Sequence, residues 1–508
     1  MIGIAPIPVK GLPAVWREKT THPRESPPLD AVRPLPYNTG MATFTVTQVL
    51  DATKGQLLIS GPQPRFTGVC TDTRALQPGD LFIALKGERV DGHDYLDAAR
   101  EQGAAGALVQ REVPGVARRK TCCGAWTLIE VTDTLYALGE LAQYHRRRFQ
   151  LPVIGITGSA GKTTTKEMTA AILAQECAVL KTPRNENNEV GLPHTLLRLT
   201  AEHQAAVVEF GMRGRGQIGY LAALAAPTIG VITNIGVTHL ELLGSREEIA
   251  LAKAELLDEM APTGVAVLPR ADACFALLRA HAPGPVVSVG ETEEADYAAR
   301  AVTLDDDGRA RFTLVTPRGD APVRLGAAGR HQVPNALAAA AAAMIAGASP
   351  DAACAGLAAY RGAAGRMHVV AARRGFRVID DTYNANPDAM RATLRCLAEM
   401  PGARKVAILG DMRELGPTER DLHRELGRYA MTLNLDALLA IGDLGRDYVA
   451  GADDPRARWY PDHAAAIAAA RAFLAPGDLV LVKGSHALAM DRIVAALVEG
   501  GWDEEVKR

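Results

Sequence analysis

The chain has 508 residues, of which 48% are hydrophobic and 22% charged, and its formal net charge is only −2. This length exceeds one ordinary hydrophobic core and predicts about three domains. The near-neutral charge and an aromatic content of 5% give no basic, aromatic-studded surface for nucleic acid, which argues against a helicase.

The seven cysteines are scattered and form no CxxC pair, which favours a reducing, cytoplasmic environment. No apolar run approaches the roughly 20 residues that a membrane-spanning helix needs, so we expect no membrane span. The N-terminus also lacks the charged-then-apolar order of a signal peptide.

Residues 1–40 contain eight of the thirty prolines and show neither helical nor strand periodicity, which predicts a disordered extension. Met41 directly precedes a strand-like run at residues 42–46. Two interpretations stay open: translation starts at Met41, or the extension is a functional tail.

Residues 41–133 show the pattern of a small α/β domain, which is the first predicted domain. A helix is expected at residues 95–102, and strands are expected at residues 68–70, 81–84, 106–109 and 127–131. An amphipathic helix is then expected at residues 134–149, before Pro152.

Residues 134–348 are predicted to form a central domain, in which apolar strands alternate with alanine-rich helices. Such alternation predicts a mostly parallel sheet covered by helices on both faces. The expected strands are residues 153–156, 179–180, 205–208, 230–233 and 265–268. A third, Rossmann-like domain is predicted at residues 349–508, with strands at 377–379, 405–409, 437–441 and 479–482. The predicted fold class is therefore α/β with three domains.

The strongest local motif is the glycine-rich segment 155–166, which follows a buried strand and precedes a helix expected to begin near Thr163. Gly158 and Gly161 allow backbone N–H groups to turn toward phosphate, and Lys162 and Thr163 suit the terminal phosphates and a magnesium ion. Ile156 stands where the strict GxxxxGK[ST] pattern requires glycine, so the spacing is a variant.

Glu209 and His239 each follow an expected parallel strand, at the edge where open α/β sheets bind ligands. A magnesium-bound nucleotide needs oxygen ligands there. Either residue alone would more often be an ordinary loop residue, but their shared position favours a site.

At this point the sequence resembles the Mur ligase family over nearly everything after Met41. The motifs that carry the resemblance are residues 71–74, 79–93, 155–166, 185–193, 209–212, 234–241, 252–254, 331–335, 380–387 and 482–485. Segments 71–74 and 79–93 look like the uridine-nucleotide-binding domain of the branch that adds D-alanyl-D-alanine. The resemblance implies a precursor-binding N-terminal domain, a central ATPase domain and a C-terminal Rossmann-like domain that closes over the nucleotide.

The implied reaction uses ATP to phosphorylate the terminal carboxylate of UDP-MurNAc-tripeptide, and the amine of D-Ala-D-Ala then attacks the acyl phosphate. UDP-MurNAc-pentapeptide, ADP and phosphate are the products, in peptidoglycan synthesis. The chemistry is physically sensible, because a carboxylate is a poor electrophile until one oxygen becomes part of a leaving group. Positioning and charge neutralisation then supply most of the catalysis.

The resemblance also assigns roles to individual residues. The phosphates would lie against Gly158, Ser159, Ala160, Gly161, Lys162, Thr163 and Thr164. The implied catalytic residues are Lys162, Glu209, His239 and Lys253. Thr163 and Glu209 would hold one Mg²⁺, and His239 with a carbamylated Lys253 would hold a second. For Lys253 an alternative stays open, namely an exposed helix lysine paired with Glu247 or Glu248.

Other implied contacts involve the nucleotide and the two substrates. Asn335, Arg366 and Asp381 would approach the adenosine and phosphates, with Tyr383, Asn384 and Asn386 nearby after domain closure. The precursor site would include Thr182, Asn187 and Asn188, and Thr73 and Arg74 would meet the uracil or diphosphate. For Thr73 and Arg74 an alternative stays open, namely a simple turn before the strand expected at residues 81–84. His486 stands where an arginine often follows the Lys-Gly-Ser motif, which puts an anion contact there in doubt.

Two alternatives to this function stay open. One is a sister ligase that adds a single amino acid, or a folate or cyanophycin ligase, against which segment 79–93 argues. The other is a non-catalytic nucleotide switch or a motion-coupled ATPase, for which Lys162 and Glu209 would suffice. We expect a monomer.

Overall fold

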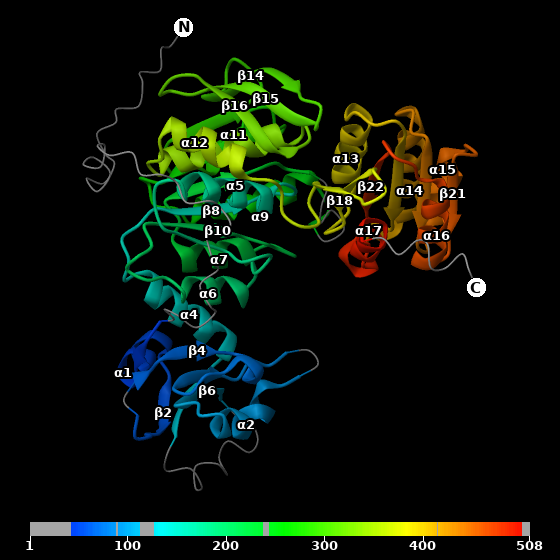
Figure 1. The fold of residues 1–508 in the computed structure, drawn as a ribbon. Coiled ribbons are helices and arrows are strands. Elements are labelled where there is room, and N and C mark those ends of the chain that lie inside the picture. Colours follow the sequence, from blue (N-terminus) through cyan, green and yellow to red (C-terminus); the bar gives the residue numbers. More distant parts are fainter. Residues whose placement is uncertain are drawn as a thin grey trace.

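Three large β-sheets, each with its own helices, follow one another along the described part of the chain (Figure 1), and a small two-stranded sheet accompanies the first. The structure is a computed structural model that describes residues 42–63, 65–87, 90–111, 126–236, 243–413 and 415–499. The predicted extension at residues 1–40 and the candidate ligand His239 lie outside the described residues. Within these ranges, no helix is both long enough and apolar enough to cross a membrane.

The N-terminal sheet, blue in Figure 1, has five strands in the order β2-β7-β6-β5-β4. Its strands are β2 (Gln56–Ile59), β4 (Gly68–Cys70), β5 (Asp80–Ile83), β6 (Gly106–Gln110) and β7 (Thr127–Val131). Only β2 runs antiparallel to its neighbour. Among its described residues, this part has the helices α1 (Val46–Thr53) and α2 (Leu96–Glu101) and the short 3₁₀ turns η3 (Thr73–Ala75) and η4 (Gly92–Tyr95).

The strand expected at residues 42–46 is largely wrong. Only Phe44 and Thr45 form a strand, β1, which pairs with β3 (Arg65–Phe66), and α1 begins at Val46. Thr45 ends the strand because it caps the helix: the Gln48 amide donates to Thr45 Oγ1 over 3.2 Å, and the Thr45 amide donates to Gln48 Oε1 over 2.9 Å. This reciprocal pair is a capping box.

The central sheet has nine strands in the order β16-β15-β14-β13-β12-β11-β8-β10-β9. The strands are β8 (Val153–Thr157), β9 (Val179–Lys181), β10 (Ala205–Glu209), β11 (Ile229–Ile232), β12 (Val265–Pro269), β13 (Val286–Gly290), β14 (Tyr297–Leu304), β15 (Arg309–Val315) and β16 (Ala321–Ala328). The sheet is parallel from β9 to β14, and β15 and β16 add an antiparallel extension that the sequence pattern did not predict.

Helices cover both faces of the central sheet, as expected. One face packs against α4 (Thr134–Arg146), α6 (Gly191–Leu196), α7 (Gln217–Ala225), α9 (Arg246–Asp258) and α10 (Phe275–His281). The other packs against α5 (Lys162–Leu173), α11 (Gln332–Ile345) and α12 (Pro350–Ala359). Alternate residues of β8 point to opposite faces: Val153 joins the first core, whereas Ile154 joins the second.

Helix α11 contains six consecutive alanines, at residues 338–343, and all six are buried. The helix packs closely on α5, which follows the phosphate loop. Because alanine ends at Cβ, the two helices can approach closely while Asn335, in the first turn of α11, faces that loop.

The C-terminal sheet has six strands in the order β17-β18-β22-β19-β20-β21, of which only β17 is antiparallel. The strands are β17 (His368–Ala371), β18 (Arg377–Asp381), β19 (Lys405–Gly410), β20 (Ala437–Ile441), β21 (Ala457–Tyr460) and β22 (Leu479–Lys483). Helices α13 (Pro387–Glu399), α14 (Glu419–Thr432) and α15 (Gly445–Ala452) contribute to one core, and α16 (His463–Phe473) and α17 (Asp491–Val498) to the other.

Candidate active site

A cavity of about 910 Å³ lies between the central and C-terminal sheets. Its walls come from the carboxyl ends of the central parallel strands, the start of α11, and the loops around β18 and the start of α13. Fourteen of the predicted site residues line it: Ser159, Ala160, Gly161, Lys162, Thr163, Thr164, Asn187, Glu209, Asn335, Arg366, Asp381, Tyr383, Asn384 and Asn386. The position agrees with the general rule for ligand sites in open α/β sheets.

The phosphate loop joins β8 to α5 through two glycines that no other residue could replace without strain. Gly161 precedes the first turn of α5 at φ 79°, and a Cβ there would lie 2.2 Å from Asn335 Oδ1. A Cβ on Gly158, at φ 152°, would lie 1.9 Å from Thr233 Oγ1. The loop is therefore backed closely by Thr233, directly after β11, and by Asn335 of α11. The amides of the first turn of α5 have no carbonyl partner within the helix, so this end of the loop suits an anion.

Lys162 begins α5, and its Nζ donates to the Gly158 carbonyl over 2.8 Å, so the ammonium folds back over the loop. Burial lowers the pKa of Lys162, the Glu209 carboxylate opposes that shift, and Arg366 adds to it. A cationic amine held over a phosphate-binding loop can stabilise charge on a transferring phosphoryl group.

Glu209, the last residue of β10, is 2% exposed and is held from three sides. Thr163 Oγ1 donates to its Oε2 over 2.9 Å, and Asn187 Nδ2 donates to its Oε1 over 2.8 Å. Lys166 Nζ lies 3.6 Å from Oε2. The carboxylate is thereby fixed beside the phosphate loop.

Thr163 and Glu209 fit a magnesium ion, because a hydroxyl and a carboxylate are hard oxygen donors and both line the cavity. The described residues contain no group of three or more His, Cys, Asp or Glu placed to hold a metal. A cation here would therefore take the rest of its ligands from phosphate and water, as Mg²⁺ commonly does.

Lys253 is only 1% exposed, so the alternative of an exposed lysine paired with Glu247 or Glu248 is wrong. Glu248 instead forms an ion pair with Arg215. Burial, with a smaller contribution from Lys162, holds the pKa of Lys253 well below its ordinary value. The residue lies on α9, outside the cavity lining, but close enough to Lys162 for that charge to act on it.

The C-terminal sheet supplies a second set of cavity residues. The Arg366 guanidinium lies 4.0 Å from the centre of the Tyr383 ring, a cation–π contact that holds both side chains. Lys483 Nζ forms an ion pair with Asp381 over 2.6 Å and donates to the Asn384 carbonyl over 2.7 Å. These contacts fix one wall of the cavity.

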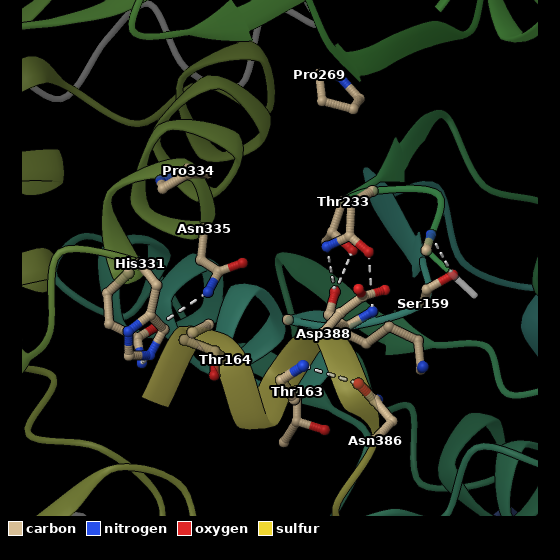
Figure 2. A pocket seen from close by; sticks show the side chains of 18 of the residues that line it. Ser159, Thr163, Thr164, Thr233, Pro269, His331, Pro334, Asn335, Asn386 and Asp388 are labelled. Carbon is tan, nitrogen blue, oxygen red and sulfur yellow. Dashed lines mark hydrogen bonds between the residues drawn. The ribbon is translucent and has the colours of Figure 1, made fainter. Parts of the chain in front are cut away.

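Asn386 caps α13, since its Oδ1 accepts from the Ala389 amide over 2.9 Å. Asn335 Nδ2 donates to Gln332 Oε1 over 3.0 Å. Figure 2 shows Thr163, Thr164, Asn335 and Asp388 around the same cavity, from three different helices. Central and C-terminal residues thus meet at one site.

The predicted residues of the N-terminal part lie apart from this cavity. Thr73 and Arg74 form η3, and the Arg74 side chain, 89% exposed, pairs with Asp72 over 2.6 Å. This part contacts the central one through Thr71 Oγ1, which lies 2.9 Å from His194 Nε2 on α6.

The side chains of two residues assigned to the precursor site accept hydrogen bonds from backbone amides in this structure. Asn188 Oδ1 accepts from the Gly191 amide over 2.9 Å at the start of α6. Thr182 is fully buried, and its Oγ1 accepts from the Glu209 amide over 3.1 Å, so its side chain does not face a ligand as expected.

His486 does not reach the cavity lining. It is exposed in a 3₁₀ turn, η6 (His486–Leu488), and its ring meets the Tyr383 ring edge-on at 5.7 Å between centroids. Sequence reasoning also missed cavity residues, notably Asp388, Asn234 and Lys483, and the buried Lys166. Lys166, Asn234 and Lys483 stand inside recognised motifs, which was the available signal.

Comparisons with known proteins agree with this geometry. Residues 65–146 match the catalytic domain of the Mur ligase family, residues 156–343 match the Mur ligase middle domain, and residues 365–486 match the Mur ligase glutamate ligase domain. The chain is 37% identical over 465 residues to the UDP-N-acetylmuramoyl-tripeptide--D-alanyl-D-alanine ligase of Escherichia coli (strain K12), which covers 91% of this chain and 100% of that protein.

Solved structures give the same result. MurF from Acinetobacter baumannii matches with a TM-score of 0.83 at 36% identity, covering 91% of this chain and 100% of that chain. The MurF ligase from Thermotoga maritima in complex with ADP matches with a TM-score of 0.75 at 28% identity, covering 84% and 96%. Similarity of this extent includes all three sheets.

Proposed function

Because the chain belongs to the Mur ligase family, we propose that it is an ATP-dependent ligase that joins D-alanyl-D-alanine to UDP-N-acetylmuramoyl-tripeptide. The observation that carries this proposal is the cavity in which a phosphate loop, a fixed carboxylate and the C-terminal residues meet. The identity of the substrates is inferred from the names of the relatives, because their similarity to this chain extends over the N-terminal part as well.

ATP fits the cavity on three grounds. The space of about 910 Å³ suits a ligand of this size, the glycine loop offers N–H groups at a helix start, and a structural relative contains ADP. In this proposal the phosphates lie on residues 158–164, and Asn335, Arg366 and Asp381 approach the nucleotide from the other walls.

Lys162 would stabilise negative charge on the γ-phosphoryl group as it passes to the precursor carboxylate. The amine of the dipeptide then attacks the activated carbonyl carbon, and phosphate leaves. The residues contribute chiefly by holding these groups together, which suits phosphoryl transfer. Water must be excluded while the activated acyl group exists, and the two-sided cavity favours that.

We propose that Thr163 and Glu209 hold one Mg²⁺, which would neutralise phosphate charge when bound. We also propose that Lys253 is carbamylated and, with His239, serves a second Mg²⁺. Support comes from the burial of Lys253, which lowers its pKa and so favours the neutral amine, the form that reacts with carbon dioxide. A buried cation without this change would be costly.

The precursor would run from the N-terminal part, at Thr73 and Arg74, toward Asn187 beside Glu209. Burial raises the pKa of Tyr383, so its hydroxyl stays protonated near Arg366 and can donate to a substrate oxygen. We further propose that the protein acts in the cytoplasm as a monomer, which sedimentation of the purified protein would check.

The test is phosphate release from the purified protein with ATP, Mg²⁺, UDP-MurNAc-tripeptide and D-Ala-D-Ala, leaving out one component at a time. We expect release only with all four, and a product heavier by one dipeptide less water. Acceptance of glutamate, alanine or diaminopimelate in place of the dipeptide would favour a sister ligase. ATP hydrolysis that ignores both substrates would favour a nucleotide switch and contradict the proposal.

A further inference from the structure

Lys166 is a lysine with no exposed surface, one turn along α5 from Lys162. Its Nζ donates to the carbonyls of Thr182 and Arg184, each over 2.8 Å. It also lies 3.6 Å from Glu209 Oε2 and 3.3 Å from Glu167 Oε1. The ammonium therefore joins the phosphate helix, the loop after β9 and the end of β10 at one point.

The loop after β9 is the segment that carries Asn187, the residue proposed above to meet the precursor beside Glu209. It turns at Arg184, whose φ of 46° is in the left-handed region that non-glycine residues rarely adopt. Lys166 binds the carbonyl oxygen of that same residue. The strained turn is thus held by a buried cation that belongs to the phosphate helix.

Asn187 is the second connection between this loop and the site. Its side chain donates to Glu209 Oε1, and its carbonyl accepts from the Gly211 amide over 2.9 Å. A Cβ on Gly211 would lie 2.6 Å from Asn187 Oδ1, so the loop sits tightly against the end of β10. A shift of the turn at Arg184 would therefore move Asn187 relative to Glu209.

We propose that Lys166 is a positioning residue that sets the precursor-binding loop at a fixed distance from the phosphate loop. The inference rests on the proposed function. Stability alone gives a poor reason for a lysine here, since an apolar residue of similar volume often serves a buried position equally well. An ammonium, unlike an apolar side chain, has three hydrogen-bond donors. It can therefore bind two carbonyls and a carboxylate at once, which fixes all three relative to α5.

The variants are Lys166→Met, which keeps an unbranched side chain one atom shorter and removes the charge, and Lys166→Arg, which keeps the charge. The chain offers a matched control in Lys181→Met, because Lys181 also pairs with Glu167 but is 47% exposed. For each protein we would measure the Kd of ADP by calorimetry and the KM values of ATP and UDP-MurNAc-tripeptide.

For Lys166→Met we expect the KM of the precursor to rise at least about tenfold, while the Kd of ADP and the KM of ATP change less than about threefold. Lys166→Arg should recover part of the precursor KM, and Lys181→Met should match the parent protein. Equal effects on ADP and precursor, or no effect on either, would overturn the proposal.

A second measurement covers the case in which Lys166→Met does not fold and binds no ADP. Amide hydrogen exchange of Lys166→Arg should then be faster at residues 184–188 than in the parent protein, with ADP binding retained. Unchanged exchange at those amides would contradict the positioning role. If the parent protein shows no precursor-dependent turnover, the proposed function fails, and ADP binding with hydrogen exchange still tests the link from Lys166 to the loop.

Discussion

Replacing Gly161 with alanine should disturb the site through two separate effects, backbone strain and a collision with Asn335. The left-handed φ of 79° costs a residue with a Cβ about 1–2 kcal/mol. The new Cβ would also lie 2.2 Å from Asn335 Oδ1, so Asn335 must move and weaken its hydrogen bond to Gln332, which adds about 1 kcal/mol. Together the two effects should lower the free energy of unfolding by about 2–3 kcal/mol.

Gly216 provides the matched control. It precedes the first turn of α7 at φ 83°, and nothing lies within 4 Å of the position a Cβ would take. Gly216→Ala should therefore show the backbone strain without the collision. Gly214→Ala, which has neither a left-handed φ nor a neighbour within 4 Å, should change nothing.

The assay is ADP binding by calorimetry, with thermal unfolding recorded alongside. Gly161→Ala should weaken ADP binding at least about tenfold, corresponding to about 1.4 kcal/mol, because loop and Asn335 both shift. Gly216→Ala should lower the unfolding midpoint yet leave the Kd within about twofold. If Gly161→Ala binds ADP as tightly as Gly216→Ala does, the argument that Asn335 backs the phosphate loop is wrong.

Three further predictions concern other regions. Burial lowers the pKa of His145 to about 4 from an ordinary 6.5, so between these pH values the unfolded chain takes up a proton that the folded protein does not. The free energy of unfolding should therefore fall by about 1.4 kcal/mol per pH unit as the pH drops through this range. In urea unfolding from pH 4.5 to 7, His145→Leu should show a weaker dependence of that free energy on pH, and an unchanged dependence would contradict the assignment. Lys253→Ala should lose about a hundredfold or more in activity, and the carbamate ¹³C signal expected from the parent protein in ¹³C-bicarbonate should be missing; full activity would remove the case for carbamylation. Arg74→Ala should raise the KM of the UDP precursor about tenfold with no change in thermal stability, because the side chain is exposed; an unaltered KM would favour a simple turn.

The sequence predicted well whatever depends on local pattern. The parallel strands of the central and C-terminal sheets are apolar runs bounded by turns, and the phosphate loop is a motif whose chemistry is contained in adjacent residues. Each of these features could be placed within a few residues. The domain boundaries and the roles of the site residues stay predictions.

Features that depend on distant parts of the chain were missed or misjudged. Strand β15 carries arginines between its apolar residues, so it does not stand out as part of a large sheet. By local pattern alone Lys166 and Lys253 look like ordinary helix lysines, and the family resemblance gave a role only to Lys253; the burial of both depends on their neighbours in the fold. Likewise, a run of residues around 380–387 cannot reveal which wall of a cavity it forms until the central sheet is in place.

The alanine tract of α11 bears on how freely this sequence can drift over time. On composition alone, residues 338–343 are a low-complexity run of alanines whose replacement should have little effect. In the folded protein all six are buried, and they belong to a helix that packs closely on α5 and on the strands of the central sheet. Valine or leucine there would push α11 outward and carry Asn335 away from the phosphate loop. We therefore expect this low-complexity tract to be among the slowest parts of the sequence to change.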